Sequence, residues 1–129
     1  LGEEVGAPSH LDHALIAPSL IMQMAVIQGM HMAKKAGVDL EFYSKMISGL
    51  PASLKADQER HTRAIIDDDF SEVQASVRTW KEALDRILEE GKGSNFNAEL
   101  LSGIGEVLRN GQDQGVGDQD LAALIKTMG

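Results

Sequence analysis

The chain has 129 residues, of which 43% are apolar and 25% are charged, and this balance predicts a single globular domain over residues 1–129. Asp and Glu number 20 against 12 Lys and Arg, so the formal charge is −8, which disfavours a nucleic acid or an anionic membrane as partner. There is no cysteine, which excludes disulfides and thiolate metal ligands and is compatible with a cytoplasmic location.

The beginning of the chain predicts a processed protein or a piece of a longer one. Leu1 stands where an initiator Met would be, and no basic stretch followed by an apolar leader is present. No uninterrupted apolar run is long enough to cross a membrane, so we expect no membrane partner.

Helical periodicity recurs from end to end without a convincing alternating strand, so the predicted fold class is all-α with about six helices. The first helix has Ser9 as candidate N-cap and runs to about Lys35, before Gly37 stops it. Pro18 lies inside it and predicts a kink. Apolar residues cover this helix on two sides, so it must be surrounded by more protein than one small domain supplies. These residues are Leu11, Leu15, Met22, Val26 and Ala33 on one side, and Ile16, Leu20, Met24 and Ile27 on the other.

Two further helices are predicted before the middle of the chain. Asp39 is the candidate N-cap of the second helix, which Gly49 and Pro51 break or bend. The third helix is weakly patterned and covers about residues 52–66.

The fourth helix has the clearest amphipathic pattern. An aspartate turn at residues 67–69 precedes Ser71 and Gln74, which have the spacing of a capping box. The glycine-containing residues 91–94 close the helix. Its apolar positions are Val73, Val77, Trp80, Leu84, Ile87 and Leu88.

The last two helices are separated by a loop rich in Gly, Asp and Gln. The fifth helix carries apolar residues between Leu100 and Leu108 and ends at Asn110 and Gly111. Asp118 is the candidate cap of the final helix.

Two motif types carry no cofactor or metal prediction. The Gly-x-Gly pairs at residues 103–105 and 115–117 follow no predicted strand and lack a third glycine, so neither is a dinucleotide-binding fingerprint. His10 and His13 lie three residues apart, but no third ligand has a matching spacing, so we expect no metal site.

Asp12 is the acidic residue near the start of an otherwise apolar helix, and the residues alone leave two interpretations open. Ser9 and Asp12 have the outline of a capping box with Asp in place of Glu, which makes Asp12 structural. The alternative is a catalytic carboxylate.

Residues 6–39, GAPSHLDHALIAPSLIMQMAVIQGMHMAKKAGVD, resemble the start of the helical domain of the β-hydroxyacid dehydrogenases, a family with a 6-phosphogluconate dehydrogenase-like C-terminal domain. In that family a glycine-containing turn leads into a long helix with a catalytic lysine and then an asparagine pair. Alignment on Gly6 and Gly37 puts Asp12 at the lysine position and Leu15 and Ile16 at the asparagine positions. The hallmarks of a hydroxyacid site are therefore missing.

This departure is similar to one branch of the family, the imine reductases and reductive aminases, which carry Asp or Tyr in place of the lysine. Residues 11–15, LDHAL, are similar to the Leu-x-Asp-x-Ala-Leu-like stretch of that branch. Residues 63–70, RAIIDDDF, are similar to its Ile-Asp-x-Gly-Asp-Tyr turn, although the glycine is absent. Residues 115–125 are similar to its final helix, so the resemblance spans nearly the whole chain.

The resemblance implies an NADPH-dependent oxidoreductase that reduces imines or iminium ions to amines, with this chain as its C-terminal substrate and dimerisation domain. A Rossmann domain ahead of Leu1 would bind most of the NADPH, and the apolar first helix would pack in an intertwined homodimer. Asp12 is then the catalytic candidate, because a carboxylate attracts an iminium cation that a lysine would repel. The candidate substrate-binding residues are Leu15, Ile16, Leu20 and Gln74, and the candidate cofactor-binding residues are Pro8, Ser9 and Arg78.

Two other functions remain compatible with the sequence. The complete protein could be a 3-hydroxyisobutyrate-dehydrogenase-like hydroxyacid oxidoreductase of the same fold, in which Asp12 only caps the helix. The chain could also be a non-enzymatic helical dimerisation module. If the protein is an enzyme, we expect this chain alone to be inactive.

Overall fold

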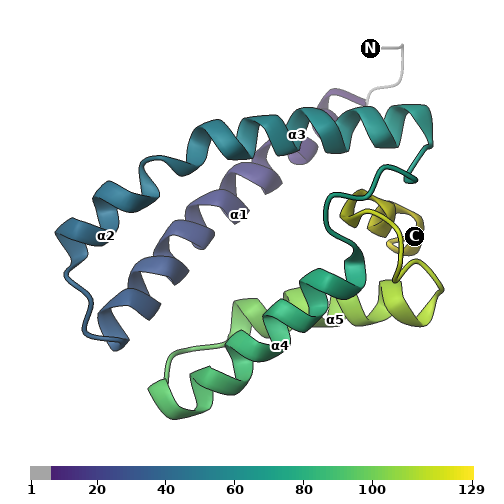
Figure 1. Ribbon diagram of the computed structural model, residues 1–129. Coiled ribbons are helices and arrows are strands. Elements are labelled where there is room, and N and C mark those ends of the chain that lie inside the picture. Colours follow the sequence, from purple (N-terminus) through teal and green to yellow (C-terminus); the bar gives the residue numbers. More distant parts are fainter. Residues whose placement is uncertain (1–6) are drawn as a thin grey trace.

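The computed structural model describes residues 7–129, with side chains from Ser9 onward, and this part of the chain contains helices and no strand (Figure 1). The all-α prediction is therefore confirmed. The elements are α1 (Ala7–Lys35), α2 (Leu40–Ile47), α3 (Leu50–Asp67), α4 (Val77–Ser94), α5 (Glu99–Asp113) and a 3₁₀ helix η1 (Leu121–Thr127).

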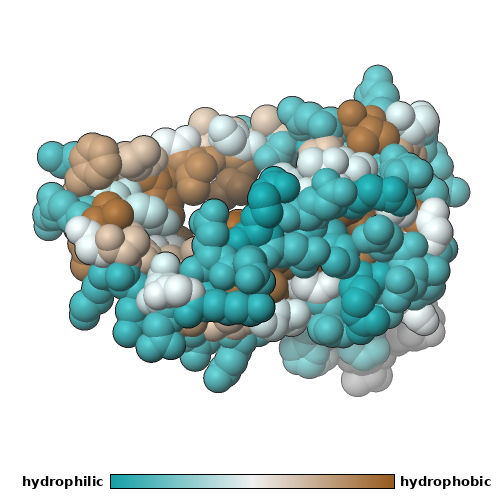
Figure 2. Space-filling model, turned by 60° about the horizontal axis from the view of Figure 1, so that its bottom comes forward, coloured by the Kyte–Doolittle hydropathy of each residue, from teal (hydrophilic) through white to brown (hydrophobic). Residues whose placement is uncertain are grey.

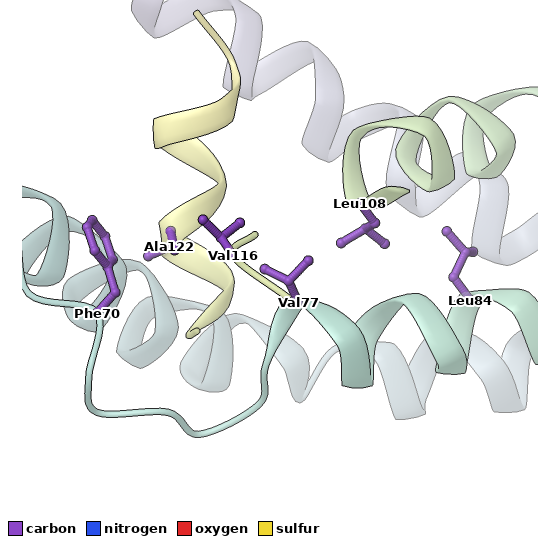
Figure 3. Close-up of a cluster of buried hydrophobic side chains, with 7 residues drawn as sticks. Phe70, Val77, Leu84, Leu108, Val116 and Ala122 are labelled. Atoms are coloured by element: carbon purple, nitrogen blue, oxygen red, sulfur yellow. The ribbon is translucent and has the colours of Figure 1, made fainter. Parts of the chain in front are cut away.

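The helices form two parts that α3 connects (Figure 1). α1, α2 and α3 make an elongated arm, in which the chain reverses direction through α2. α4 and α5 pack against each other, and η1 packs against α3, α4 and α5. The hydrophobic core lies in this second part, and Figure 3 shows side chains from α4, α5 and η1 that meet there. Its buried members are Phe70, Val77, Leu84, Leu108, Val116, Ala122 and Ala123.

The first turn of α4 is capped by a segment far along the chain. The backbone N–H groups of Val77 and Arg78 donate to the carbonyls of Gln119 (3.0 Å) and Gly117 (2.8 Å). The next free N–H, that of Thr79, donates to the Ser76 hydroxyl at 3.1 Å. These contacts satisfy donors that have no partner inside the helix, and they fix α4 against residues 117–120.

Asp120 is buried, with 1% of its surface exposed, and its carboxylate connects three segments. Oδ1 accepts a hydrogen bond from Nη1 of Arg60 on α3 at 2.9 Å and one from the backbone N–H of Gln74 at 3.4 Å. Oδ2 accepts from the N–H of Ala122 at 3.1 Å and so caps η1. Burial raises the pKa of Asp120, but the two backbone N–H groups and Arg60 together outweigh burial and hold this pKa below its usual value.

α1 contacts the rest of the chain mainly through its C-terminal third. The side-chain amide of Gln28 donates to the carbonyl of Asn97 at 3.0 Å, and the N–H of Asn97 donates to Nε2 of His31 at 2.9 Å. Ala33 is buried in this region, and the hydroxyl of Tyr43 fills the space that a Cβ would need at Gly29. These contacts hold the end of α1 against α2 and the loop between α4 and α5.

The remainder of α1 carries large apolar side chains that stay exposed, from 39% for Leu11 to 65% for Leu15. Figure 2 shows apolar side chains toward the end of the molecule where α2 and the C-terminal end of α1 lie, whereas the front is mainly hydrophilic. By length and composition, residues 9–35 would be apolar enough to cross a membrane, although polar residues such as Asp12, His13 and Gln23 interrupt the apolar run. The prediction that this helix needs more protein around it than the chain supplies agrees with its exposure.

The long first helix is confirmed, but its predicted start is wrong. α1 begins no later than Ala7, so Ser9 lies inside the helix rather than at its N-cap. The helix continues through Pro18, and the clear bend in the chain lies at residues 48–49, between α2 and α3. The kink predicted at Pro18 stays a prediction.

The second helix has its predicted cap, since the Asp39 carboxylate accepts from the N–H of Glu41. The break predicted at Gly49 and Pro51 is confirmed by the bend at residues 48–49. Pro51 lies in the first turn of α3, where proline is tolerated because the N–H groups there have no intrahelical partner. α3 ends at Asp68 with φ +49°, a left-handed conformation that Asp tolerates.

The capping box predicted at Ser71 and Gln74 is wrong. Both hydrogen bonds of Ser71, from its N–H and its hydroxyl, go to the Asp69 carboxylate, and they hold the pKa of Asp69 below its usual value. Residues 71–76 cross beside Asp120 in an irregular conformation, so α4 starts at Val77 with Ser76 as N-cap. Val73 is therefore not part of the helix.

The fifth helix does not end at Asn110 and Gly111 but continues to Asp113. Gly111 is buried where α5 meets η1, and Leu124, Val116 and Val77 occupy the space around its Cα. Asp120 caps the final helix, not Asp118, whose side chain is 87% exposed and pairs with Arg78.

We expect Asp120→Asn to lower the free energy of unfolding by about 2 kcal/mol, because hydrogen bonds to a charged partner are worth about 1.5–3 kcal/mol each and the isosteric amide keeps the volume. Urea denaturation followed by circular dichroism measures the change. Asp113→Asn is the control, since this exposed carboxylate pairs only with Arg109. Equal effects of the two substitutions would contradict the role of Asp120.

The contribution of Asp120 should also depend on pH. Because its pKa is lowered in the folded state, its stabilising effect is complete above the unfolded pKa of about 4 and is lost as the pH falls through the folded pKa. The difference in unfolding free energy between wild type and Asp120→Asn should therefore narrow as the pH drops below about 4. A difference that stays constant down to the acid-unfolding range would contradict this assignment.

Candidate functional site

Four of the predicted site residues lie together on α1. Asp12, Ile16 and Leu20 are spaced four residues apart, and Leu15 is adjacent, so they share one face of the helix. All four are exposed, with values of 65% for Leu15, 63% for Ile16 and 58% for Leu20. The arrangement is a single carboxylate at the end of an apolar surface.

The structure removes one of the two interpretations of Asp12. Ser9 and Asp12 both lie inside α1, so they form no capping box. Among the described residues, no salt bridge holds the Asp12 carboxylate. Asp12 is also the only Asp, Glu, Lys or Arg between residues 9 and 33. A charge in that position has no evident structural function in this chain.

The two cofactor candidates at the start of α1 are helical residues. Ser9 is exposed in the first turns of the helix, one turn before Asp12. Pro8 belongs to the same helix, but its side chain lies outside the described residues.

Arg78 lies in the first turn of α4, where the loop of residues 115–118 packs against it. Its Nη1 is 3.1 Å from Oδ1 of Asp118, and its side chain is 42% exposed. The Nε of Arg78 is buried and has no hydrogen-bond partner among the described residues. The guanidinium is thus held on one side and open to solvent on the other.

Gln74 is not on α4, although the predicted capping box put it in the first turn of that helix. It lies in the irregular segment before the helix, where its backbone N–H donates to Asp120. Its side chain is exposed in a shallow groove that also contains Asp57, Arg60 and Glu72.

The predicted site residues form two separate groups in one chain. No hydrogen bond or salt bridge between side chains of residues 9–129 joins the group on α1 to Arg78 or Gln74. The α1 group is an apolar surface with one acid. The α4 group is the guanidinium of Arg78, which pairs with Asp118 near a helix N-terminus, where the helix dipole also favours electron-rich ligands.

The sequence did not predict the residues that position Gln74 and the start of α4. With Asp118 as the predicted cap, Asp120 would lie inside the final helix, and Arg60 had no predicted function. The only available signal for Asp120 was its place directly before the final apolar stretch, a place for which Asp118 competed.

The chain matches one protein family over most of its length. The family model described as the NAD-binding domain of NADP-dependent 3-hydroxyisobutyrate dehydrogenase matches residues 16–128. The chain belongs to this family. The matched range begins after Asp12, so the family model itself does not cover the catalytic candidate.

Several solved structures share this fold over almost the entire chain. An imine reductase from Myxococcus stipitatus in complex with NADP+ matches with a TM-score of 0.93 and 20% identity over 100% of this chain and 48% of its own. An imine reductase from Pseudomonas sp. matches with a TM-score of 0.81 and 26% identity over 95% and 42%. A reductive aminase from Aspergillus terreus in complex with NADPH and ethyl levulinate matches with a TM-score of 0.86 and 17% identity over 98% and 44%. No curated protein sequence matches the chain.

These comparisons establish the fold and the family. The chain spans about half the length of the structures that it matches, and its fold is that of the imine reductases and reductive aminases. The predicted membership in the β-hydroxyacid dehydrogenase family is confirmed by the family model, and the predicted likeness to imine reductases is confirmed for the fold.

Proposed function

We propose that this chain is the C-terminal substrate and dimerisation domain of a cytoplasmic, NADPH-dependent oxidoreductase that reduces imines or iminium ions to amines. The observation that carries the proposal is the carboxylate of Asp12, which has no salt bridge with any of the described residues and which lies at the end of an exposed apolar face of α1. The fold shared with imine reductases and reductive aminases supports it.

The chemistry of the α1 face suits an apolar amine precursor. An iminium ion is cationic, so a carboxylate at Asp12 attracts it, whereas a lysine at that position would repel it. The same carboxylate can hold or relay a proton of the amine product. Leu15, Ile16 and Leu20 would contact the apolar part of the substrate and exclude water once the face is covered.

NADPH would supply the hydride, and most of its binding site would belong to a Rossmann domain outside this chain. The described residues fit a minor share of that site: Arg78 presents a half-exposed guanidinium at the N-terminus of α4, and Ser9 lies exposed one turn before Asp12. Arg78 would hydrogen-bond the cofactor, and Pro8 and Ser9 would line its edge.

The exposed length of α1 supports a homodimer in which a second copy covers this helix. Large apolar side chains from Leu11 to Ile27 stay exposed in a single chain, and a contiguous apolar surface of this kind marks an interaction site. A second copy would also bring another α4 group to the substrate face, and this would join the two groups that lie apart in one chain.

One finding favours a second candidate function. The matching family model is named for 3-hydroxyisobutyrate dehydrogenase, so the complete protein could oxidise a small hydroxyacid instead. Against this, Asp12, Leu15 and Ile16 stand where the lysine and asparagines of such a site would be. Assay of the complete protein against cyclic imines and short hydroxyacids separates the two functions. Oxidation of a hydroxyacid without imine reduction would favour the second.

In the complete protein, Asp12→Asn should lower kcat for imine reduction by about 100-fold or more, since positioned acid–base groups contribute 10²–10⁴-fold. The amide keeps the shape but cannot hold the proton or attract the cation. Steady-state kinetics with NADPH measures the effect. Thermal unfolding should be unchanged, because the amide has the same volume and the Asp12 carboxylate has no salt bridge with the described residues. An unchanged kcat would remove Asp12 from the mechanism.

Ile16→Glu combined with Leu20→Glu should convert a dimer into a monomer, because burying two unpaired carboxylates in an apolar interface is strongly unfavourable. Light scattering of the purified protein measures the mass. Gln58→Glu, an exposed polar site on α3, adds the same kind of charge and should leave the dimer intact. A monomeric wild-type protein, or one that sediments with phospholipid vesicles, would contradict the dimer.

A further inference from the structure

The loop that contains the second Gly-x-Gly pair, residues 115–117, packs against one side of Arg78. Gly115 has φ +93°, which turns the chain after α5 and brings residues 116–118 back onto the start of α4. The carbonyl of Gly117 accepts the backbone N–H of Arg78 at 2.8 Å, and the Asp118 carboxylate pairs with Nη1 at 3.1 Å. One short loop thus contacts both the backbone and the guanidinium of the same residue.

Position 117 requires glycine because the Arg78 side chain leaves no room for a Cβ atom there. Gly117 is buried, and a Cβ added to it would stand 2.9 Å from Nη2 of Arg78 and 3.3 Å from Cγ of Gln112. The atom that would have to move is the end of the Arg78 side chain. A methyl group at this position would therefore displace the guanidinium and leave the loop itself in place.

Asp118 contributes orientation and little stability. Its side chain is 87% exposed, and an ion pair at such a position stabilises a fold only slightly. The pair nevertheless fixes one edge of a planar group whose Nε faces the protein. The remaining exposed edge of the guanidinium then points in one defined direction.

We propose that Gly117 and Asp118 are positioning residues that set the direction of the Arg78 guanidinium toward the cofactor. This inference rests on the proposed function, in which Arg78 contacts NADPH. Gly117 provides the space for Nη2, and Asp118 holds Nη1, so both act through Arg78 and neither touches the cofactor.

The direction in which Asp118→Asn changes the affinity for NADPH tests this proposal. If Asp118 only offset the charge of Arg78 in front of an anionic cofactor, then Asp118→Asn would strengthen NADPH binding. If Asp118 positions Arg78, the same substitution weakens binding, although it removes a negative charge.

The experiment is a double-mutant cycle in the complete protein, with the NADPH Kd from fluorescence titration and with KM and kcat measured in parallel. Asp118→Asn and Gly117→Ala should each weaken NADPH binding about three- to fivefold, the equivalent of one ion pair, and raise KM for NADPH more than they change kcat. Neither should weaken binding further when Arg78→Ala is present. Asp118→Glu, which keeps the charge, should retain most of the affinity.

The controls match each change in kind. Gly103→Ala places a methyl group in open space on α5, and Asp113→Asn removes the partner of an exposed arginine elsewhere. Both should leave the Kd unchanged. Gly117→Ala is compared only after its melting temperature is measured, and Asp118→Asn at the exposed position tests the proposal if Gly117→Ala fails to fold.

The outcomes separate this inference from the proposed function. If Arg78→Ala weakens NADPH binding but Asp118→Asn does not, or if Asp118→Asn strengthens it, the positioning role is wrong and the cofactor role of Arg78 stands. If Arg78→Ala leaves the Kd unchanged, the cofactor role of Arg78 is wrong and the positioning role falls with it. Equal weakening by Asp118→Asn with and without Arg78 also overturns the inference, because the two residues would then act independently.

Discussion

The buried carboxylate of Asp120 is the constraint on which the second part of the fold depends. It joins α3 through Arg60, the irregular segment through the N–H of Gln74, and η1 through the N–H of Ala122. A buried charge is tolerated only when its lone pairs are satisfied, and three donors from three segments satisfy this one. The arm of the molecule and its hydrophobic core are thereby held in one arrangement.

This constraint also sets the start of α4 and with it the place of Arg78. Because Asp120 fixes residues 117–120 beside the segment that precedes Val77, the carbonyls of Gly117 and Gln119 reach the free N–H groups of the helix. The first two N–H groups of α4 are thus satisfied by Gln119 and Gly117, which lie far along the chain, and not by a local capping box. The candidate cofactor contact therefore depends on tertiary structure that lies outside its own helix.

α1 contrasts with this well-connected part. Gln28 and His31 hold its C-terminal third against Asn97, whereas Asp12, Leu15 and Ile16 stay exposed. An apolar helix that its own chain does not bury is suited to packing against another chain, and a carboxylate on it becomes effective only once water is excluded. The proposed substrate site and the proposed dimer thus have a common physical origin.

The sequence by itself determined the helical class, the long apolar first helix and the isolated position of Asp12, because hydrophobic periodicity and the identity of a single charge are local properties. It also carried the resemblance that the family comparison bears out. Only the tertiary structure decided that Ser76 and not Ser71 begins α4, that Asp120 and not Asp118 caps η1, and that α5 runs through Gly111. Each of these depends on partners far away in the chain. A capping residue or a helix glycine is chosen by the donor or side chain that packs against it, which short-range spacing does not contain.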